Sequence, residues 1–242
     1  MNETTSESKD SVYKTLCKVG GSASLLFLIY SMITMVILTV FGVQPNTAIE
    51  CFTMLQTNHI LGLLRMDLLT AFVMPLYLLI FLGIFIALKG SDSAYSIIAI
   101  ICVFVGVTLF IATPSALAMM NLRDQYAMAT TEIEKNQLIA AGEAILSADM
   151  FHGTGAIIGR FLIQVGALIF SIEMLRGKTF NKFTGYVGII AHGLDLVHLI
   201  FMLIMPAAGN ILMAIAGTLY LLWFPFVGVR LIQIGKKVTI SI

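Results

Sequence analysis

The sequence has few charged residues. Asp, Glu, Lys and Arg make up only 11% of its 242 residues, whereas hydrophobic residues make up 59%. A typical soluble domain has about 25% charged residues and needs them to cover its surface. This low share of charge excludes an ordinary soluble domain and predicts a membrane protein. The formal net charge is +1 and no basic cluster is present, so we expect no nucleic-acid partner.

Cysteine is also scarce, and motifs for cofactors are missing. Cys17, Cys51 and Cys102 are far apart in the sequence. Each falls in a different predicted compartment, so we expect no disulfide within the chain. None has the spacing of metal ligands. The sequence also has no phosphate-binding loop, serine-nucleophile motif or haem motif. We therefore expect neither a metal nor a cofactor.

Long apolar runs dominate the rest of the chain. A membrane-spanning helix needs about 20 mostly apolar residues. The runs show no alternation with period two, which excludes a transmembrane β-barrel. We predict an all-α bundle of six transmembrane helices. The predicted spans are Gly20–Val43, His59–Leu88, Ala94–Met120, Phe151–Leu175, Thr184–Pro206 and Ala207–Arg230.

The loop between the third and fourth spans is the only long one on its side of the membrane. Thr131 and Glu134 fit a capping box, and Leu138, Ala141 and Ile145 would share one helical face. The pattern predicts a short amphipathic helix resting on the outer surface. Such a helix is either a solvated connector or a lid over a cavity.

Basic residues in the loops predict the orientation in the membrane, because cytoplasmic loops carry more Lys and Arg. With six spans, one side holds Lys9, Lys14, Lys18, Lys89, Arg176, Lys178, Lys182, Arg230, Lys236 and Lys237. The other side holds Arg123 and Lys135, with Arg65 in the outer part of span two. We therefore predict a cell-membrane protein with both termini in the cytoplasm. Its tails cover 1–18 and 236–242, and its transmembrane domain covers 19–235.

Several strongly polar side chains fall inside the predicted spans. These are Arg65, Asp67, Arg160, Gln164, His192, Asp195 and His198. At about 1.5 Å rise per residue, Asp67, Arg160 and His198 lie ~12–13 Å below the outer ends of their spans. Asp195 lies ~16 Å below the outer end of span five. Unpaired charges at such depths are costly, so we expect these groups to face one another.

Two interpretations of this polar layer remain open. In the first, it is an internal ion-pair network that fixes helix packing, with Arg160 paired to Asp195 or Asp67 from another span. In the second, it lines an outward-facing, water-filled cavity that binds or conducts a small solute, an ion or a lipid. Membrane lipids and a small-molecule or ion ligand are the partners that this second interpretation implies.

An enzyme is the alternative hypothesis. His192, Asp195 and His198 could serve an intramembrane lipid hydrolase, or the same three residues could relay protons. Because His192 and His198 are ~9 Å apart along one helix, a single metal ion would not easily reach both. The sequence therefore favours a non-enzymatic membrane protein.

A family resemblance covers most of the chain. Arg65 and Asp67 open a long apolar span that ends at Lys89, and a long outer loop leads into a glycine-bearing fourth span. The segment from Gly166 onward has Met174-Leu175-Arg176, a basic loop with Phe180, then Gly185-Tyr186 and Asp195. In these features the chain resembles the prokaryotic membrane-protein family defined by domain of unknown function 4386. The resemblance implies six helices and a bacterial or archaeal cell membrane, and it implies no activity.

Overall fold

The computed structural model describes residues 3–88, 94–113 and 115–236, and it is 86% helical with no strand in these ranges. The all-α prediction is therefore confirmed. The helices are α1 (Glu3–Phe41), α2 (Ala48–Thr57), α3 (His59–Arg65), α4 (Leu68–Val73), α5 (Leu76–Ala87), α6 (Ala94–Ile111), α7 (Ala116–Met128), α8 (Glu132–Ser147), α9 (Thr154–Arg176), α10 (Lys182–Ile204) and α11 (Pro206–Lys236).

Six helical segments are long and apolar enough to cross a membrane. They are Ser11–Phe41, Leu68–Ala87, Ala94–Met128, Thr154–Arg176, Lys182–Ile204 and Pro206–Lys236. Large apolar side chains such as Leu26, Ile101 and Ile200 are more than half exposed along them. A soluble protein rarely exposes so much apolar surface. The chain is thus an all-α, multi-pass membrane protein.

Several ends of the spans differ from the prediction; the third span, for example, reaches Met128 and the last reaches Lys236. The predicted amino-terminal tail belongs, from Glu3 onward, to the same helix as the first span. Of the predicted carboxy-terminal tail, residues 237–242 lie outside the described residues. Lys89 also lies outside them. The second span begins at Leu68 and not at His59, because the helix breaks between Arg65 and Leu68. The depth predicted for Asp67 assumed an unbroken helix and is therefore wrong.

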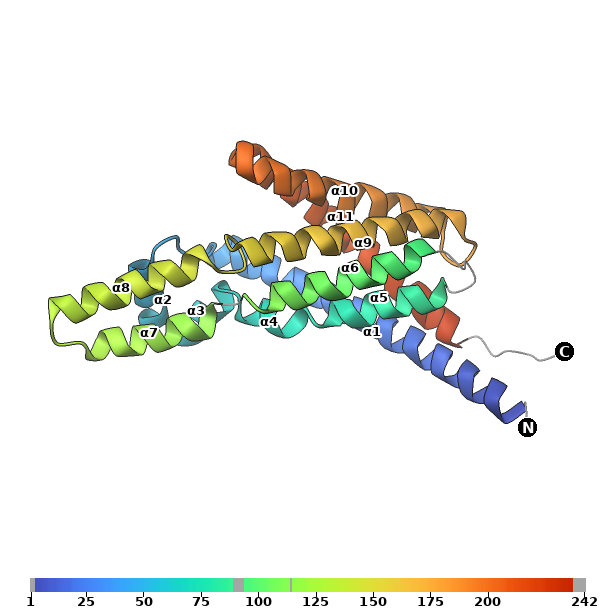
Figure 1. Ribbon diagram of the computed structural model, residues 1–242, viewed down its shortest axis with the longest axis horizontal. Helices are drawn as coiled ribbons and strands as arrows, with labels where there is room; N and C mark the ends of the chain where they lie inside the picture. The colour runs from blue at the N-terminus through green and yellow to red at the C-terminus, as the bar shows by residue number, and fades with distance from the viewer. Residues whose placement is uncertain (1–2, 89–93, 114, 237–242) are drawn as a thin grey trace. The chain divides into compact units, whose positions relative to one another are not determined.

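The described chain falls into two compact units. Unit 1 comprises Met1–Ser31, Pro75–Val107 and Phe161–Ile242, and unit 2 comprises Met32–Met74 and Thr108–Arg160. Within unit 1, α10 and α11 run side by side as an antiparallel hairpin with only Met205 between them (Figure 1). Pro206 begins α11, where its missing N–H leaves no unmet hydrogen bond.

Aromatic side chains form much of the core of unit 1. Trp223 and Phe224 of α11 are almost completely buried, with 0% and 1% exposure. The Trp223 ring packs 6.0 Å from the ring of Phe81, which stacks 5.7 Å from Phe170 of α9. Burying such rings stabilises the bundle by packing and by ring geometry. This core places the middle of α9, α10 and α11 close together.

Unit 2 contains a cluster of short helices, of which the sequence predicted only α8. Helices α7 and α8 form an antiparallel hairpin, and α2 packs against both (Figure 1). Phe52 and Leu55 of α2 are completely buried beside Met119 of α7 and Leu146 of α8. Gly142 allows the close approach of α8 to α2, because a Cβ there would lie 2.7 Å from the Ala48 Cβ.

The predicted amphipathic helix exists as α8, and its capping box is present. The Thr131 hydroxyl accepts from the Glu134 N–H at 3.2 Å, and the Glu134 carboxylate accepts from the Thr131 N–H at 3.3 Å. The predicted apolar face is shifted, however. Gly142 and Leu146 are buried, whereas Ala141 is exposed. The shift arises because the glycine, and not its neighbour, faces α2.

Candidate functional site

Four polar side chains from three spans form one hydrogen-bonded cluster in unit 1. We call Gln164 of α9, His192 and Asp195 of α10 and Tyr220 of α11 the polar cluster. The Gln164 amide nitrogen donates to Asp195 Oδ2 at 2.5 Å, and Gln164 Oε1 lies 2.7 Å from His192 Nδ1. The Gln164 amide therefore joins the carboxylate to the imidazole. Three of the residues predicted from sequence meet here.

Tyr220 completes the polar cluster. Its hydroxyl lies 3.0 Å from Asp195 Oδ2, 3.1 Å from Gln164 Oε1 and 3.2 Å from His192 Nδ1. A hydroxyl has one hydrogen, so it can donate to Asp195 Oδ2 or to Gln164 Oε1 but not to both at a time. The polar cluster therefore has more than one possible arrangement of hydrogens.

The imidazole of His192 is completely buried among aromatic rings. Its ring centre lies 4.8 Å from Trp223 and 5.1 Å from Tyr220. Because Gln164 Oε1 can only accept, the Nδ1 atom of His192 carries the hydrogen of that bond. The opposite nitrogen, Nε2, is buried and has no hydrogen-bond partner among the described residues. It is consequently left as an open acceptor inside the bundle.

His198 lies apart from this network. It is on α10 with His192, and its Nδ1 lies 3.0 Å from the backbone oxygen of Gly209 on α11. This bond joins the two helices of the hairpin near their connection at Met205. His198 therefore has a backbone partner on α11, and no hydrogen bond among the described residues joins it to the polar cluster.

Asp67 has a structural partner in unit 2. Its carboxylate is completely buried and accepts from the backbone N–H groups of Ser115 and Ala116 and from the Ser115 hydroxyl. These backbone groups are at the start of α7, where the first N–H groups of a helix have no partner inside the helix. Asp67 thus caps α7, and the negative charge also suits the helix dipole.

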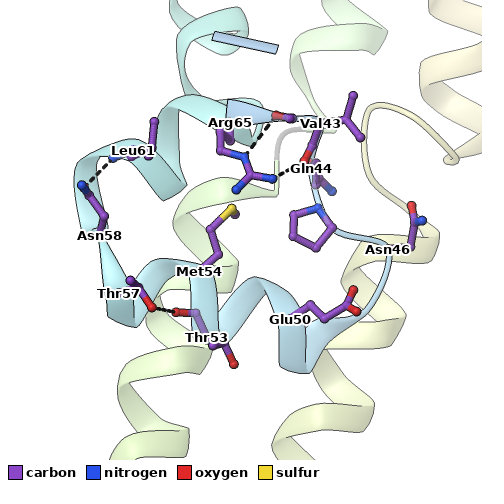
Figure 2. A pocket seen from close by; sticks show the side chains of 12 residues that line it. Val43, Gln44, Asn46, Glu50, Thr53, Met54, Thr57, Asn58, Leu61 and Arg65 are labelled. Atoms are coloured by element: carbon purple, nitrogen blue, oxygen red, sulfur yellow. Dashed lines mark hydrogen bonds between the residues drawn. The ribbon is translucent and has the colours of Figure 1, made fainter. Parts of the chain in front are cut away.

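Arg65 lies on the wall of a pocket in unit 2. The pocket has a volume of about 770 Å³ and is lined by Gly42, Val43, Gln44, Pro45, Asn46, Glu50, Thr53, Met54, Thr57, Asn58, Leu61 and Arg65. Figure 2 shows the Arg65 guanidinium directed at the loop that follows α1. It donates to the oxygens of Gly42 at 3.1 Å and Val43 at 2.6 Å. Gly42 has φ +84°, which favours glycine.

Arg160 lies near the start of α9 in unit 2. Its Nη2 group donates to the backbone oxygen of Phe151 at 3.2 Å, which ties α9 to the segment before it. Asp195 belongs to unit 1, and the pairing of Arg160 with Asp195 stays a prediction. The Asp67 carboxylate, the other predicted partner, accepts hydrogen bonds from Ser115 and Ala116 at the start of α7.

Tyr220 was missed because a tyrosine inside an apolar span is usually an ordinary core residue. A signal was nevertheless present in the sequence. Tyr220 and His192 are at similar distances from Met205, which joins the two helices of the hairpin. Residues equally far from a tight turn between antiparallel helices lie opposite one another. Counting outward from the predicted turn would have placed the hydroxyl beside the imidazole.

Comparisons with protein-family models, with curated proteins and with solved structures each found no match for this chain. The resemblance to the family of domain of unknown function 4386 therefore stays a prediction.

Proposed function

We propose that the chain is a cell-membrane protein with cytoplasmic termini that binds and conducts a small cation, most simply a proton. The polar cluster would be the binding site. The resemblance to the family of domain of unknown function 4386 belongs to the same proposal and agrees with a prokaryotic cell membrane. No activity is carried over from that resemblance.

The observation that supports this proposal is the open Nε2 atom of His192. An unsatisfied buried polar group costs about 1–3 kcal/mol, and the free lone pair on Nε2 is the position at which this imidazole would take up a proton. The resulting imidazolium would share the polar cluster with the Asp195 carboxylate. Intramembrane His and Asp residues in such pairs are typical of proton relays.

The groups that face His192 come from α9, α10 and α11, and one of them, Asp195, is a carboxylate. Gln164 of α9 is neutral, and Tyr220 and Trp223 of α11 contribute a hydroxyl and an indole. Asp195, on the same helix as His192, contributes the only carboxylate of the polar cluster. We therefore assign Asp195 the role of counter-ion and His192 the role of proton acceptor.

The alternative prediction, a lipid hydrolase using His192, Asp195 and His198, has less support. His198 bonds to the Gly209 backbone and not to the other two residues. In the part of the chain that the structure describes, no three His, Cys, Asp or Glu side chains are grouped to hold a metal ion. No observation here favours the enzyme over the cation-binding protein.

Proton movement into proteoliposomes would test the proposal. The purified protein would be reconstituted with a pH-sensitive dye inside, and a potassium diffusion potential would drive proton entry. We expect the wild-type protein to acidify the interior. Asp195→Asn should abolish this acidification, because the amide cannot neutralise a protonated His192.

His152→Gln provides the control, because the His152 side chain is 59% exposed and lies outside the polar cluster. This variant should acidify the interior like the wild-type protein. Size-exclusion profiles would show that all variants remain folded. Equal proton entry in wild-type protein and Asp195→Asn would overturn the proposal.

A further inference from the structure

A second pocket lies in unit 1, where α11 passes the segment between α9 and α10. Its volume is about 780 Å³. It is lined by Lys178, Phe180, Asn181, Thr184, Leu222, Pro225, Phe226, Val229, Arg230 and Gln233. We call it the basic groove. None of its lining residues belongs to the polar cluster.

The basic groove changes from apolar to basic along α11. Leu222, Phe226 and Val229 are exposed apolar side chains at one end, with exposures of 45%, 43% and 48%. Arg230 and Gln233 follow them. From Leu222 to Gln233 the helix rises ~16 Å, which is enough for a lipid headgroup together with the first part of an acyl chain.

The polar end of the basic groove suits an anion. Lys178 and Arg230 line it, and no acidic residue is among the described residues that line it. The Arg230 Nε–H donates to the Thr179 backbone oxygen at 2.5 Å, which holds the planar guanidinium in place. Arginine has five N–H groups, so most of its donors remain for a phosphate. The Asn181 side-chain oxygen is used by the Phe183 N–H, and its NH₂ group adds neutral donors.

We propose that the basic groove binds the headgroup of an anionic phospholipid, with one acyl chain along Leu222, Phe226 and Val229. Basic pockets between transmembrane helices are suited to anionic headgroups. The apolar half distinguishes this occupant from free phosphate, which would leave three large side chains uncovered. This proposal uses none of the residues assigned to cation binding and does not depend on that function.

Native mass spectrometry of the full chain in detergent would test the lipid site. Phosphatidylglycerol and phosphatidylcholine would be added in turn, and the fraction of protein with one bound lipid would be measured. We expect phosphatidylglycerol to bind more tightly. Lys178→Gln should weaken its binding on the order of fivefold, as expected for one basic side chain near the headgroup. Gln233→Glu should weaken it similarly by repulsion.

Lys236→Gln is the matched control, because Lys236 is an exposed lysine on α11 outside the basic groove. It should leave phosphatidylglycerol binding unchanged. Gln233 is exposed, so the Gln233→Glu variant should fold even if changes at Arg230 do not. Equal binding of the two lipids, equal effects of Lys178→Gln and Lys236→Gln, or full displacement of the lipid by inorganic phosphate would each overturn the proposal.

Discussion

Gln164 is the residue that holds the polar cluster together. Its amide donates to Asp195 and accepts from His192, so Gln164→Leu would leave the half-buried carboxylate and the buried imidazole without that partner. We expect a loss of about 1–3 kcal/mol in the free energy of unfolding. Hydrogen bonds between membrane helices average about 0.6 kcal/mol each, so the two bonds of this amide correspond to about 1 kcal/mol, the lower end of that range. Reversible unfolding in mixed micelles would measure the change.

A polar residue of the same kind on the surface serves as the control for this prediction. Gln137 lies on α8 and is exposed. Gln137→Leu should change the free energy of unfolding by less than about 0.5 kcal/mol. Similar losses in the two variants would mean that the amide of Gln164 contributes no specific stabilisation.

Cys51 is a buried thiol whose ionisation is suppressed. It is completely buried, and its Sγ lies 3.6 Å from the Pro45 oxygen. Burial, followed by the charges of Glu143, Glu50 and Asp149, raises the pKa of Cys51 from 9.0 to about 12. At pH 8 only about one folded thiol in ten thousand would be ionised, compared with about one in ten for a cysteine whose pKa is 9.0. Iodoacetamide should therefore label Cys51 only after unfolding, as peptide mapping would show.

The same pKa shift predicts a dependence of stability on pH. Because the pKa of Cys51 is higher in the folded state, its contribution is complete below about pH 9 and is lost as the pH rises towards 12. The loss would be at most about 1.4 kcal/mol per pH unit. Cys51→Ala should remove this part of the alkaline destabilisation. An identical pH profile in the variant would contradict the assignment.

At the scale of elements, Asp67 connects the break after α3 with the start of α7. Asp67→Ala would leave the Ser115 and Ala116 N–H groups buried without an acceptor. We expect about 1–3 kcal/mol of destabilisation, with less in Asp67→Asn because one acceptor oxygen remains. Hydrogen exchange should speed up in the first turn of α7. Glu132→Ala, at an 81% exposed side chain, should leave that exchange unchanged.

The long helices could be predicted from sequence, and the short ones could not. A span is a local property, because about 20 apolar residues in a row suffice to cross a membrane. The helices α2 and α3 are 10 and 7 residues long, too short for such a signal. They are held by long-range contacts, such as the Glu143 carboxylate on the Ala48 N–H at 2.7 Å. The break between α6 and α7 was not predicted, because the run Ala94–Met120 has no charged residue to mark it.

The candidate site was also predictable only in part. Gln164, His192 and Asp195 were singled out because polar groups inside a span need partners, and that argument uses only sequence position. Asp67 was assigned to the same layer, yet it caps a helix in unit 2, because depth does not reveal where a helix breaks. Tyr220 lies in the polar cluster because the hairpin of α10 and α11 places it beside His192. That hairpin is a feature of tertiary structure, which the sequence of a single span does not reveal.

At the scale of the whole molecule, the proposed orientation follows from an even number of spans and from the positions of the basic residues. Both termini then share one side with Lys178, and Lys135 lies on the other side.

In a variant with the three native cysteines replaced, Lys135→Cys and Lys178→Cys would each add a single thiol. Lys135 lies on α8 and Lys178 is exposed between α9 and α10, so both positions are outside the apolar parts of the spans. A membrane-impermeant maleimide should label Lys135→Cys in intact cells and should label Lys178→Cys only after permeabilisation. The opposite result would invert the orientation, and labelling of both positions in intact cells would contradict the number of spans between them.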